Sequence, residues 1–524
     1  MSIADHGLGV LEIPAGTSWR RNEETKRALE TGFLPAYLAR VRWFPRGRGD
    51  IRVRLTALMP LTVEDDSMVL AFIETSDNSR YVLPLEIDWS EGARAGQAKF
   101  IVAEVRTGDR EAVLRDVATD PAFIKRLLDS LRRASEIAAS GWRLEFRPTS
   151  QLSSEAAAPP QRIRAIEREQ SNSTALVDQD YVVKLYRRIE YGPNPEIEMS
   201  HFLTELAGFA HTPPLLGHLQ AVQDDRVYAL AVVHCFVPNR GDGWTFSADR
   251  IAIYLDAVNE GSEERDKALT VRRDYMLWAR RLGTRVAEMH HALASRTDVT
   301  DFEPDPIDRA DMERWLADIS ERTARICSRF RDGSDVFDSI EYGLIRRVAS
   351  ASERFAEFGR RLAKACAGGC KIRHHGDLHL GQVLVANDDV TIIDFEGEPS
   401  RAISERRRKA PAARDVAGVV RSLDYAAMAV IEQRRAEGQL TPAQSRALSA
   451  WRDNSTEAFL SGYFESVGET RVWPENAEDA KTILNFFLLE KALYEVEYEL
   501  SYRPTWIGVP LRGVVRTLNE FSEL

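Results

Sequence analysis

The sequence has few cysteines, no long hydrophobic run and no excess of positive charge, and each absence excludes a class of protein. Lysine and arginine number 70 against 81 aspartate and glutamate residues, so the net charge is −11. This balance disfavours a nucleic-acid or anionic-membrane partner, because both attract a basic surface. The longest largely apolar run, Tyr228 to Val237, is much shorter than the roughly 20 residues that span a bilayer. The N-terminus has no basic leader, so we expect a cytoplasmic protein.

The four cysteines do not form paired Cys-x-x-Cys motifs. Cys366 and Cys370 lie four residues apart, just before His374 and His375, which raises the question of a zinc site. That spacing without a second matching pair is a weak signal for zinc, and the two histidines belong to a motif with a better explanation. We therefore expect reduced cysteines with a structural role.

The chain has 524 residues, 44% of them hydrophobic, and is long enough for two or three globular units. Alternating apolar residues between 51 and 105 predict antiparallel strands, and the Ser-, Ala- and Pro-rich segment before residue 162 is typical of a surface linker. The predicted parts are a β-rich N-terminal cap with a following helix, a linker, a small lobe and a helical C-terminal lobe, at residues 1–147, 148–161, 162–238 and 239–524.

From residue 162 the pattern predicts strand, turn, strand and helix, which is the order of a protein-kinase small lobe. A strand over 227–236 then meets Pro238, which lacks the N–H that a strand ladder needs, so we expect a hinge there. The following lobe is strongly helical, with one predicted hairpin within 382–395. The predicted fold class is α+β, a bilobal eukaryotic-protein-kinase-like fold with an additional β-rich N-terminal cap.

The sharpest motif runs from His375 through Asp377 to Gln382, and continues across the hairpin with Asp394-Phe-Glu396. In phosphoryl-transfer enzymes an aspartate orients or deprotonates the attacking hydroxyl, and an amide and a second aspartate hold Mg²⁺ against the phosphates. Asp377, Gln382 and Asp394 occupy these positions. A capping turn and an ordinary strand end would explain either half alone, but not both halves at this separation.

Lys184 interrupts an apolar strand and supplies the cation that a kinase needs at the phosphates of ATP. A buried ammonium requires a partner, and we expect Glu198, ahead of Glu196, to provide it. The alternative is that Lys184 extends to solvent at a strand edge. Where a kinase often has a glycine-rich loop over the phosphates, this chain has a turn with hydroxyl and amide side chains. The predicted nucleotide contacts are therefore Lys184, Glu198, Ser171, Asn172, Ser173, Thr174 and, at the hinge, Val237.

The C-terminal stretch 490–506 has helical spacing, and four of its residues share one face of that helix: Lys491, Tyr494, Glu495 and Tyr498. An aromatic ring against the apolar side of a sugar, with charged groups at the hydroxyls, would make this face a sugar site. The alternative is a packed helix with a rim of charges. His290 and His291, by contrast, close a helix where imidazoles suit the negative end of the dipole, and we leave them out of the site.

Five blocks of the chain resemble the maltokinases, which belong among the aminoglycoside-phosphotransferase-like kinases. The blocks are EQSNSTALV at 169–177, VVKLYRRIEYGPNPEIEMSHFLTE at 182–205, HHGDLHLGQVL at 374–384, IDFEGEP at 393–399 and EKALYEVEYELSYRPTWIGVPL at 490–511. Gln382 in place of the usual Asn, the DFEGEP segment and the tail are more specific than the motifs shared by the whole fold.

The resemblance implies ATP- and Mg²⁺-dependent phosphorylation of maltose at the anomeric hydroxyl, giving maltose 1-phosphate for bacterial glycogen and α-glucan synthesis. It makes trehalose synthase a candidate partner or fusion, and we expect a monomer when the chain is alone. It implies that Asp377 is the base and that Asp415 braces the catalytic loop. The implied metal ligands are Gln382, Asp394 and Glu396, and the implied substrate contacts are His375, Asp377, Arg414, Lys491, Tyr494, Glu495 and Tyr498.

Two other functions stay open. A kinase for another sugar or amino sugar, such as glucosamine, would share the ATP machinery, but its pocket should offer extra carboxylates for the ammonium. A neutral disaccharide instead needs donors, acceptors and an aromatic platform. A pseudokinase that binds a glucan enzyme would be expected to lose a metal ligand, yet Gln382 and Asp394 are both present.

Overall fold

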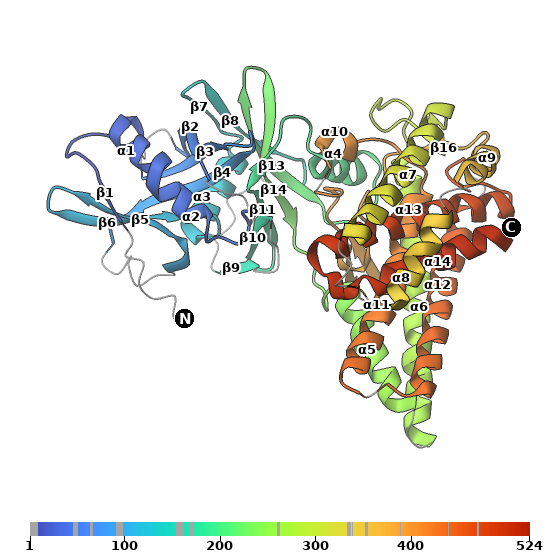
Figure 1. The fold of residues 1–524 in the computed structure, drawn as a ribbon. Helices are drawn as coiled ribbons and strands as arrows, with labels where there is room; N and C mark the ends of the chain where they lie inside the picture. Colours follow the sequence, from blue (N-terminus) through green and yellow to red (C-terminus); the bar gives the residue numbers. More distant parts are fainter. Residues whose placement is uncertain are drawn as a thin grey trace. The chain divides into compact units, whose positions relative to one another are not determined.

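The computed structural model divides into two compact units (Figure 1). Unit 1 comprises Met1–His201 and Pro213–Val237, and unit 2 comprises Phe202–Thr212 and Pro238–Leu524. The structure describes residues 9–45, 51–62, 67–90, 98–152, 162–166, 171–258, 262–332, 337, 339–351, 355–387, 389–399, 401–438, 440–468 and 471–523.

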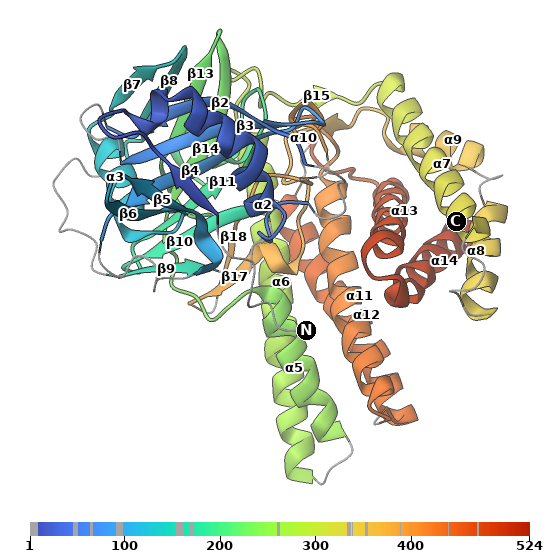
Figure 2. The same cartoon turned by 60° about the vertical axis from the view of Figure 1, so that its left-hand side comes forward.

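The first sheet of unit 1 has the strand order β1-β5-β6-β4-β3-β2, with β12 also paired to β4. One of its faces packs against short N-terminal helices, α1 (Glu23–Ala28) and α2 (Leu34–Leu38), which lie across the strands in Figure 2. The strands are β1 (Val10–Glu12), β2 (Val53–Pro60), β3 (Met68–Thr75), β4 (Arg80–Asp88), β5 (Ile101–Thr107), β6 (Arg110–Asp116) and β12 (Arg188–Ile189).

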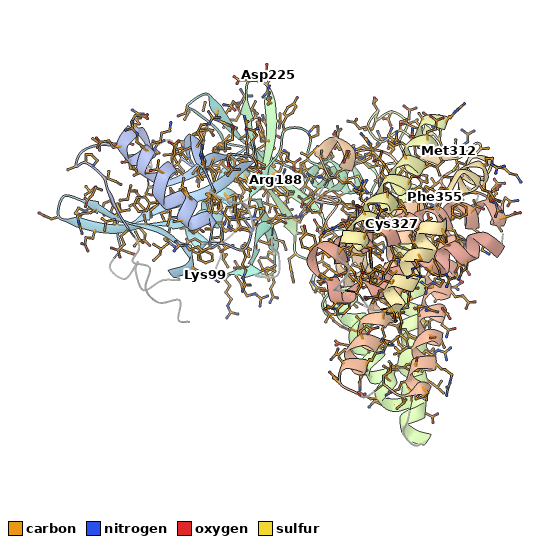
Figure 3. All side chains as sticks on the ribbon, in the orientation of Figure 1. Lys99, Arg188, Asp225, Met312, Cys327 and Phe355 are labelled. Atoms are coloured by element: carbon orange, nitrogen blue, oxygen red, sulfur yellow. The ribbon has the colours of Figure 1, made fainter. Side chains whose placement is uncertain are left out.

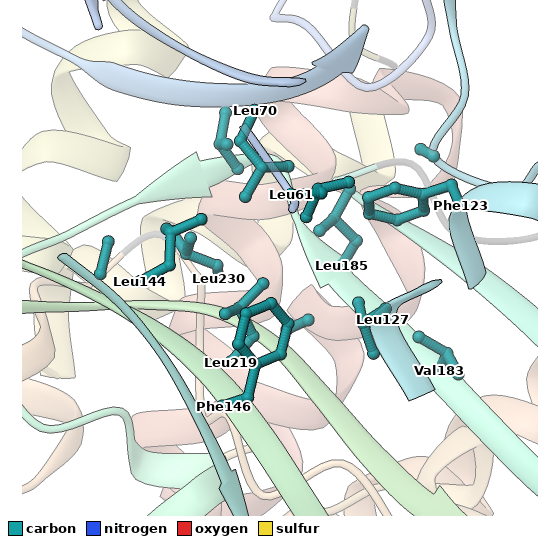
Figure 4. Close-up of a cluster of buried hydrophobic side chains, with 14 of the residues drawn as sticks. Leu61, Leu70, Phe123, Leu127, Leu144, Phe146, Val183, Leu185, Leu219 and Leu230 are labelled. Carbon is teal, nitrogen blue, oxygen red and sulfur yellow. The ribbon is translucent and has the colours of Figure 1, made fainter. Parts of the chain in front are cut away.

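The second sheet of unit 1 has the order β7-β8-β13-β14-β11-β10-β9. Its apolar face shares one core with the first sheet and with helix α3 (Pro121–Arg132), as Figure 4 shows for Leu70, Phe123 and Leu185. Helix α4 (Pro195–His201) follows β12. The strands are β7 (Glu136–Ala139), β8 (Trp142–Pro148), β9 (Ile163–Ile166), β10 (Asn172–Val177), β11 (Tyr181–Tyr186), β13 (Leu215–Gln223) and β14 (Arg226–Cys235).

The segments predicted as cap and small lobe lie in one unit and share one core. The predicted limit at 147 falls inside β8, and β7 and β8 belong to the second sheet together with β9–β11. Residues 153–161 of the predicted linker lie outside the described residues. Strand pairing over long sequence separations joins these segments, and no local pattern reports it. The four-part division of the chain stays a prediction.

Unit 2 is helical apart from short strand pairs, which include the predicted hairpin of β17 (Val383–Ala386) and β18 (Asp389–Ile392). Helix α11 is buried along much of its length, and this burial explains its apolar character on several sides. The helices are α5 (Gly243–Val258), α6 (Ser262–Leu293), α7 (Arg309–Asp332), α8 (Ser339–Ala351), α9 (Phe355–Ala365), α10 (Ile403–Arg406), α11 (Ala413–Ala436), α12 (Pro442–Val467), α13 (Ala477–Tyr502) and α14 (Gly508–Glu523).

All four cysteines are free thiols. Figure 3 labels Cys327 on α7, where it is half-buried. Burial raises the pKa of Cys366 to about 12, so this side chain stays a neutral thiol. Among the helices within the described ranges, none has both the length and the apolar character needed to cross a bilayer.

Helices α6 and α12 approach each other backbone to backbone through two glycines. A Cβ atom on Gly283 would lie 2.0 Å from the carbonyl oxygen of Phe459, and one on Gly462 would lie 1.9 Å from the carbonyl oxygen of Arg280. Neither position has room for a side chain, because the obstacle is backbone on a facing helix.

We predict that Gly283→Ala lowers the free energy of unfolding by about 2–3 kcal/mol, because the helices must move apart. Gly343→Ala on α8 is the matched control, since nothing lies within 4 Å of its added Cβ. It should stabilise the protein by about 0.5–1 kcal/mol through helix propensity. Urea unfolding of the two variants measures both effects, and equal stabilities would contradict the close packing of α6 and α12.

Candidate active site

The predicted catalytic loop lies in unit 2, and a buried carboxylate holds its first turn. The Oδ2 and Oδ1 atoms of Asp415 accept the backbone N–H groups of His375 and Gly376 at 2.7 and 3.0 Å. Nε2 of His290 lies 3.3 Å from Oδ2, and the hydroxyl of Tyr463 lies 2.9 Å from the other imidazole nitrogen. Burial alone would raise the pKa of Asp415, but the His290 hydrogen bond and nearby histidines hold it well below its usual range.

Asp377, the predicted base, forms an ion pair with Lys491 of α13, and Nζ lies 3.0 Å from Oδ1. Burial would raise the pKa of Asp377, but the charge and hydrogen bond of Lys491, together with His379 and His375, outweigh it and the net shift is downward. Burial would lower the pKa of Lys491, but the carboxylates of Asp377 and Glu398 raise it. Each charge therefore keeps the other ionised.

The predicted metal ligands lie on either side of the β17–β18 hairpin. Gln382 directly precedes β17, and Asp394 and Glu396 come after β18. Nε2 of Gln382 donates to Oδ2 of Asp394 at 2.9 Å, and the N–H of Ile393 donates to the carbonyl oxygen of Gln382. Asp394 has a φ of 66°, a left-handed conformation that is uncommon outside glycine and clusters at functional sites. Glu396 follows, with Oε1 3.6 Å from Nη1 of Arg406. Carboxylate and amide oxygens suit Mg²⁺, so these residues fit the metal that the motif implies.

Beside Asp377 is a narrow pocket, which we call the acceptor pocket. Four carboxylates and three cations are among its lining residues. The lining residues are Gly376, Asp377, Leu378, Glu398, Arg401, Arg414, Asp415, Gly418, Glu490, Lys491 and Tyr494. A pocket with this many fixed charges is suited to a small polar molecule with several hydroxyl or amino groups.

Glu398 and Glu490 are the carboxylates of this pocket that the sequence analysis did not assign. Glu398 pairs with Arg401, and one of its oxygens lies 3.6 Å from Nζ of Lys491. Glu490 pairs with Arg414, and its Oε1 lies 3.9 Å from Arg401. Burial would raise the pKa of Glu398, but Lys491, Arg401 and Arg414 lower it, so the side chain is ionised.

The structure brings some of the predicted substrate contacts together and separates others. Lys491, Tyr494 and Arg414 line the acceptor pocket with Asp377. Glu495 instead accepts from Nε of the buried Arg421 on α11 at 3.0 Å, so it does not share the pocket face of Lys491. The face of the helix predicted from residue spacing included Glu495, which in the structure contacts α11.

Tyr498, also predicted to contact substrate, is 42% exposed and extends a row of tyrosines along α13. Its ring centroid lies 6.5 Å from that of Tyr494 and 4.8 Å from that of Tyr502. His375 lies in a different environment. It is 1% exposed, its Nε2 lies 2.9 Å from the carbonyl oxygen of Ile393, and its ring packs on Phe395. These contacts hold His375 against residues 393–395, and its contact with substrate stays a prediction.

Lys184 in β11 of unit 1 is buried, and its Nζ lies 3.0 Å from Oε2 of Glu196 in α4. The hydroxyl of Tyr186 donates to the same oxygen at 2.7 Å. Glu198 was predicted ahead of Glu196 as this partner, and the structure reverses that order. Asn194 accepts the N–H of Glu196 and so positions the first turn of α4.

The residues predicted as a phosphate-covering turn belong largely to a strand. Ser171 precedes β10, and Asn172, Ser173 and Thr174 are its first residues. Thr174 pairs with Lys184 across β10 and β11, whereas Ser173 pairs with Leu185. Because successive side chains alternate, Ser173 points to the opposite face from Thr174 and Lys184. Gln170 lies outside the described residues, and Val237 follows β14 as the last residue of unit 1.

Residues that the sequence analysis missed fall into two groups. Glu398 and Glu490 were within the quoted blocks DFEGEP and EKALYE, so a closer reading of carboxylates in those blocks could have found them. His290 was interpreted as a helix end, and its contact with Asp415 joins residues 125 positions apart. No local signal predicts that contact.

We predict that Asp415→Asn lowers the free energy of unfolding by about 3 kcal/mol at neutral pH, because a buried charge loses its bonded partners. Its folded pKa lies below the unfolded value, so the carboxylate stabilises the protein above about pH 4 and this contribution is lost as pH falls through the folded pKa. Urea unfolding at several pH values should show the difference from wild type narrowing in acid.

Asp453→Asn is the control for this pH dependence. The side chain of Asp453 is 66% exposed and pairs with Arg452 on the surface of α12. The substitution should change stability by less than about 1 kcal/mol. A constant difference between Asp415→Asn and wild type down to strongly acidic pH would contradict the role given to the Asp415 carboxylate.

No protein-family model matches the chain. The chain is similar to the glucosamine kinase of Streptacidiphilus jiangxiensis, with 26% identity over 470 residues, 87% of this chain and 90% of that protein. It is also similar to the glucosamine kinase of Mycolicibacterium smegmatis, with 27% identity over 361 residues, 68% of this chain and 80% of that protein.

Solved structures of glucosamine kinases are also similar to this chain. A glucosamine kinase in complex with glucosamine, ADP and inorganic phosphate matches with a TM-score of 0.59 and 22% identity, covering 94% of this chain and 98% of that chain. A second crystal form of glucosamine kinase matches with a TM-score of 0.61 and 24% identity, covering 94% and 99%. The α+β, protein-kinase-like fold class predicted from the sequence is confirmed, and the chain has the fold of the glucosamine kinases.

Proposed function

We propose that this protein is a kinase that transfers the γ-phosphoryl group of ATP to a hydroxyl of a small sugar, with glucosamine as the first candidate acceptor. The observation that carries the proposal is the Asp377–Lys491 ion pair beside a pocket of fixed charges, in the same unit as the hydrogen-bonded Gln382 and Asp394. The similarity in sequence to glucosamine kinases supports the same class of reaction.

In the proposed reaction the oxygen of a sugar hydroxyl attacks the γ-phosphorus, and a new P–O bond forms while the bond to the β-phosphate oxygen breaks. ADP leaves with that electron pair, and the hydroxyl proton passes to a carboxylate oxygen of Asp377. Lys491 keeps Asp377 ionised and ready to accept the proton. Asp415 fixes the backbone of the loop, so the carboxylate does not have to reorganise during the reaction.

Gln382, Asp394 and Glu396 would hold Mg²⁺, which supplies charge neutralisation at the triphosphate when bound. Lys184, oriented by Glu196, is the proposed cation for the phosphate oxygens of ATP. The other proposed nucleotide contacts are Ser171, Asn172, Thr174 and Val237.

Glucosamine takes first place because of two carboxylates in the acceptor pocket. Glu398 and Glu490 are both buried, and they are the groups that an amino-sugar site needs for its ammonium. Both already have arginine or lysine neighbours, so an incoming ammonium would join an existing charge network. A hydroxyl in the same place would offer no charge to these carboxylates.

Maltose is the second candidate, and a specific observation favours it. The row of Tyr494, Tyr498 and Tyr502 begins at the acceptor pocket and becomes more exposed along α13, with Tyr502 72% exposed. Aromatic faces stack on the apolar side of sugar rings, so such a row suits an acceptor with a second ring. With maltose as the acceptor, the product would be maltose 1-phosphate, which would be used in glycogen synthesis. Trehalose synthase would then stay a candidate partner.

The test is ADP release from Mg²⁺-ATP with glucosamine, glucose, N-acetylglucosamine or maltose, with the product identified by NMR. We expect kcat/KM for glucosamine to exceed that for glucose by at least about tenfold, because glucose has an uncharged hydroxyl where glucosamine has its amino group. Asp377→Asn should reduce turnover by about 10²–10⁴-fold while nucleotide binding remains. Turnover with maltose alone would move the second candidate to first place, and nucleotide binding without turnover would favour a pseudokinase.

The role of Lys491 predicts a change in the pH–rate profile. Turnover requires ionised Asp377, so it is lost as pH falls through the pKa of this carboxyl, which Lys491 lowers. In Lys491→Met the burial remains without the cation, so this pKa rises and the acid limb of kcat/KM moves to higher pH. An acid limb at the same pH in both enzymes would contradict the proposed coupling.

A further inference from the structure

Arg187 lies where the chain of unit 1 passes from its second sheet to its first. It follows β11 of the second sheet and precedes β12, which pairs with β4 of the first sheet. Its carbonyl oxygen accepts the N–H of Val82 in β4 at 2.9 Å. The next residue, Arg188, is labelled among the side chains of unit 1 in Figure 3. The backbone of Arg187 thus already belongs to both sheets.

Its guanidinium is held by the first sheet. Nη1 lies 2.9 Å from Oδ2 of Asp116, at the end of β6, and Nη2 donates to Oδ1 at 3.0 Å. The two side chains are 2% and 1% exposed. The hydroxyl of Tyr37 also donates to Oδ2, and Cζ of Arg187 lies 4.8 Å from the ring centroid of Trp43. Two parallel contacts to one carboxylate and an aromatic face leave this guanidinium little freedom.

The Nε–H of this guanidinium reaches β10. Nε of Arg187 donates to Oγ of Ser173 at 2.8 Å. One rigid group therefore connects the end of β6 with the start of β10. Lysine could not make the same set of contacts, because its ammonium is a single point at the end of a flexible chain.

The contact with Ser173 is on one face of β10, and the proposed nucleotide contacts are on the opposite face. Ser173 lies on the same face of β10 as Ala175, which is in the core between the two sheets. The residue after Ser173 is Thr174, which is opposite Lys184 on the other face. Fixing Ser173 thus fixes the position of Thr174 without adding a contact to the nucleotide.

We propose that Arg187 is a positioning residue for nucleotide binding, through which Asp116 in the N-terminal sheet holds β10 in place. The inference rests on the proposed kinase function. It gives the N-terminal sheet a part in that function, since a buried guanidinium must keep its carboxylate partner and so ties β10 to β6. Without the connection, β10 keeps its ladders to β9 and β11 and its place in the shared core but loses the polar restraint at its start, and nucleotide affinity falls.

The experiment is a double-mutant cycle on the full chain, with the Kd for Mg²⁺-ADP measured by calorimetry. We expect Asp116→Asn and Ser173→Ala each to raise this Kd by about tenfold, because each removes a charge-assisted contact of Arg187. The double variant should bind no more weakly than the weaker single variant, since both changes break one connection. The KM for the acceptor sugar should stay unchanged in all three, which distinguishes positioning of β10 from a general loss of structure.

Arg187→Lys and Arg188→Ala complete the design. Arg187→Lys keeps a cation for Asp116 and should match Ser173→Ala, so it tests the inference even if Asp116→Asn does not fold. Arg188 is 51% exposed at its side chain and should leave the Kd unchanged when replaced by Ala. Two results would overturn this inference without affecting the proposed function. One is a double variant in which the increases in Kd of the two single variants multiply, and the other is an unchanged Kd in Ser173→Ala and Arg187→Lys. Wild-type protein that binds no Mg²⁺-ADP would remove the proposed function as well.

Discussion

The ammonium of Lys491 lies between the carboxylates of Asp377 and Glu398, and the chemistry proposed for unit 2 depends on this arrangement. A partly buried aspartate without a cation would be driven towards its neutral form, and a neutral acid cannot accept a proton from a sugar hydroxyl. Lys491 reverses that tendency, and the two carboxylates in turn hold the ammonium in its charged form. The proposed base and the acceptor pocket are therefore one electrostatic unit, supplied by the predicted catalytic loop, the DFEGEP segment and α13.

Buried charge pairs have a second consequence in this protein, which is to join segments that are distant in sequence. Asp415 holds the first turn of the catalytic loop from α11, and Glu196 holds Lys184 from α4. Arg187 does the same between the two sheets of unit 1 through Asp116. Removal of one partner from such a pair leaves an uncompensated buried charge, so each connection resists local rearrangement. Groups that must be placed accurately for phosphoryl transfer are thus supported by elements that take no part in the chemistry.

The acceptor pocket also shows why substrate identity is a finer question than reaction class. In the proposed reaction Lys491 and Asp377 would serve any sugar hydroxyl, whereas Glu398 and Glu490 would favour an amino group and the tyrosine row on α13 a longer acceptor. These features are not exclusive, because they lie at different parts of the same helix and loop. Discrimination between acceptors depends on how many contacts each one gains or leaves unpaired.

Features of this protein that have local signals could be predicted from the amino-acid sequence. The motif from His375 to Gln382, the hairpin before Asp394 and the cation at Lys184 were all visible, because loop chemistry and strand alternation operate over a few residues. The protein-kinase-like fold class followed from their order, and it is confirmed. Only the tertiary structure decided which charges meet. Glu196 rather than Glu198 faces Lys184, Glu495 turns to Arg421, and His290 reaches Asp415. Such choices depend on helix rotation and on contacts between residues 12 to 125 positions apart, which no spacing within one segment records.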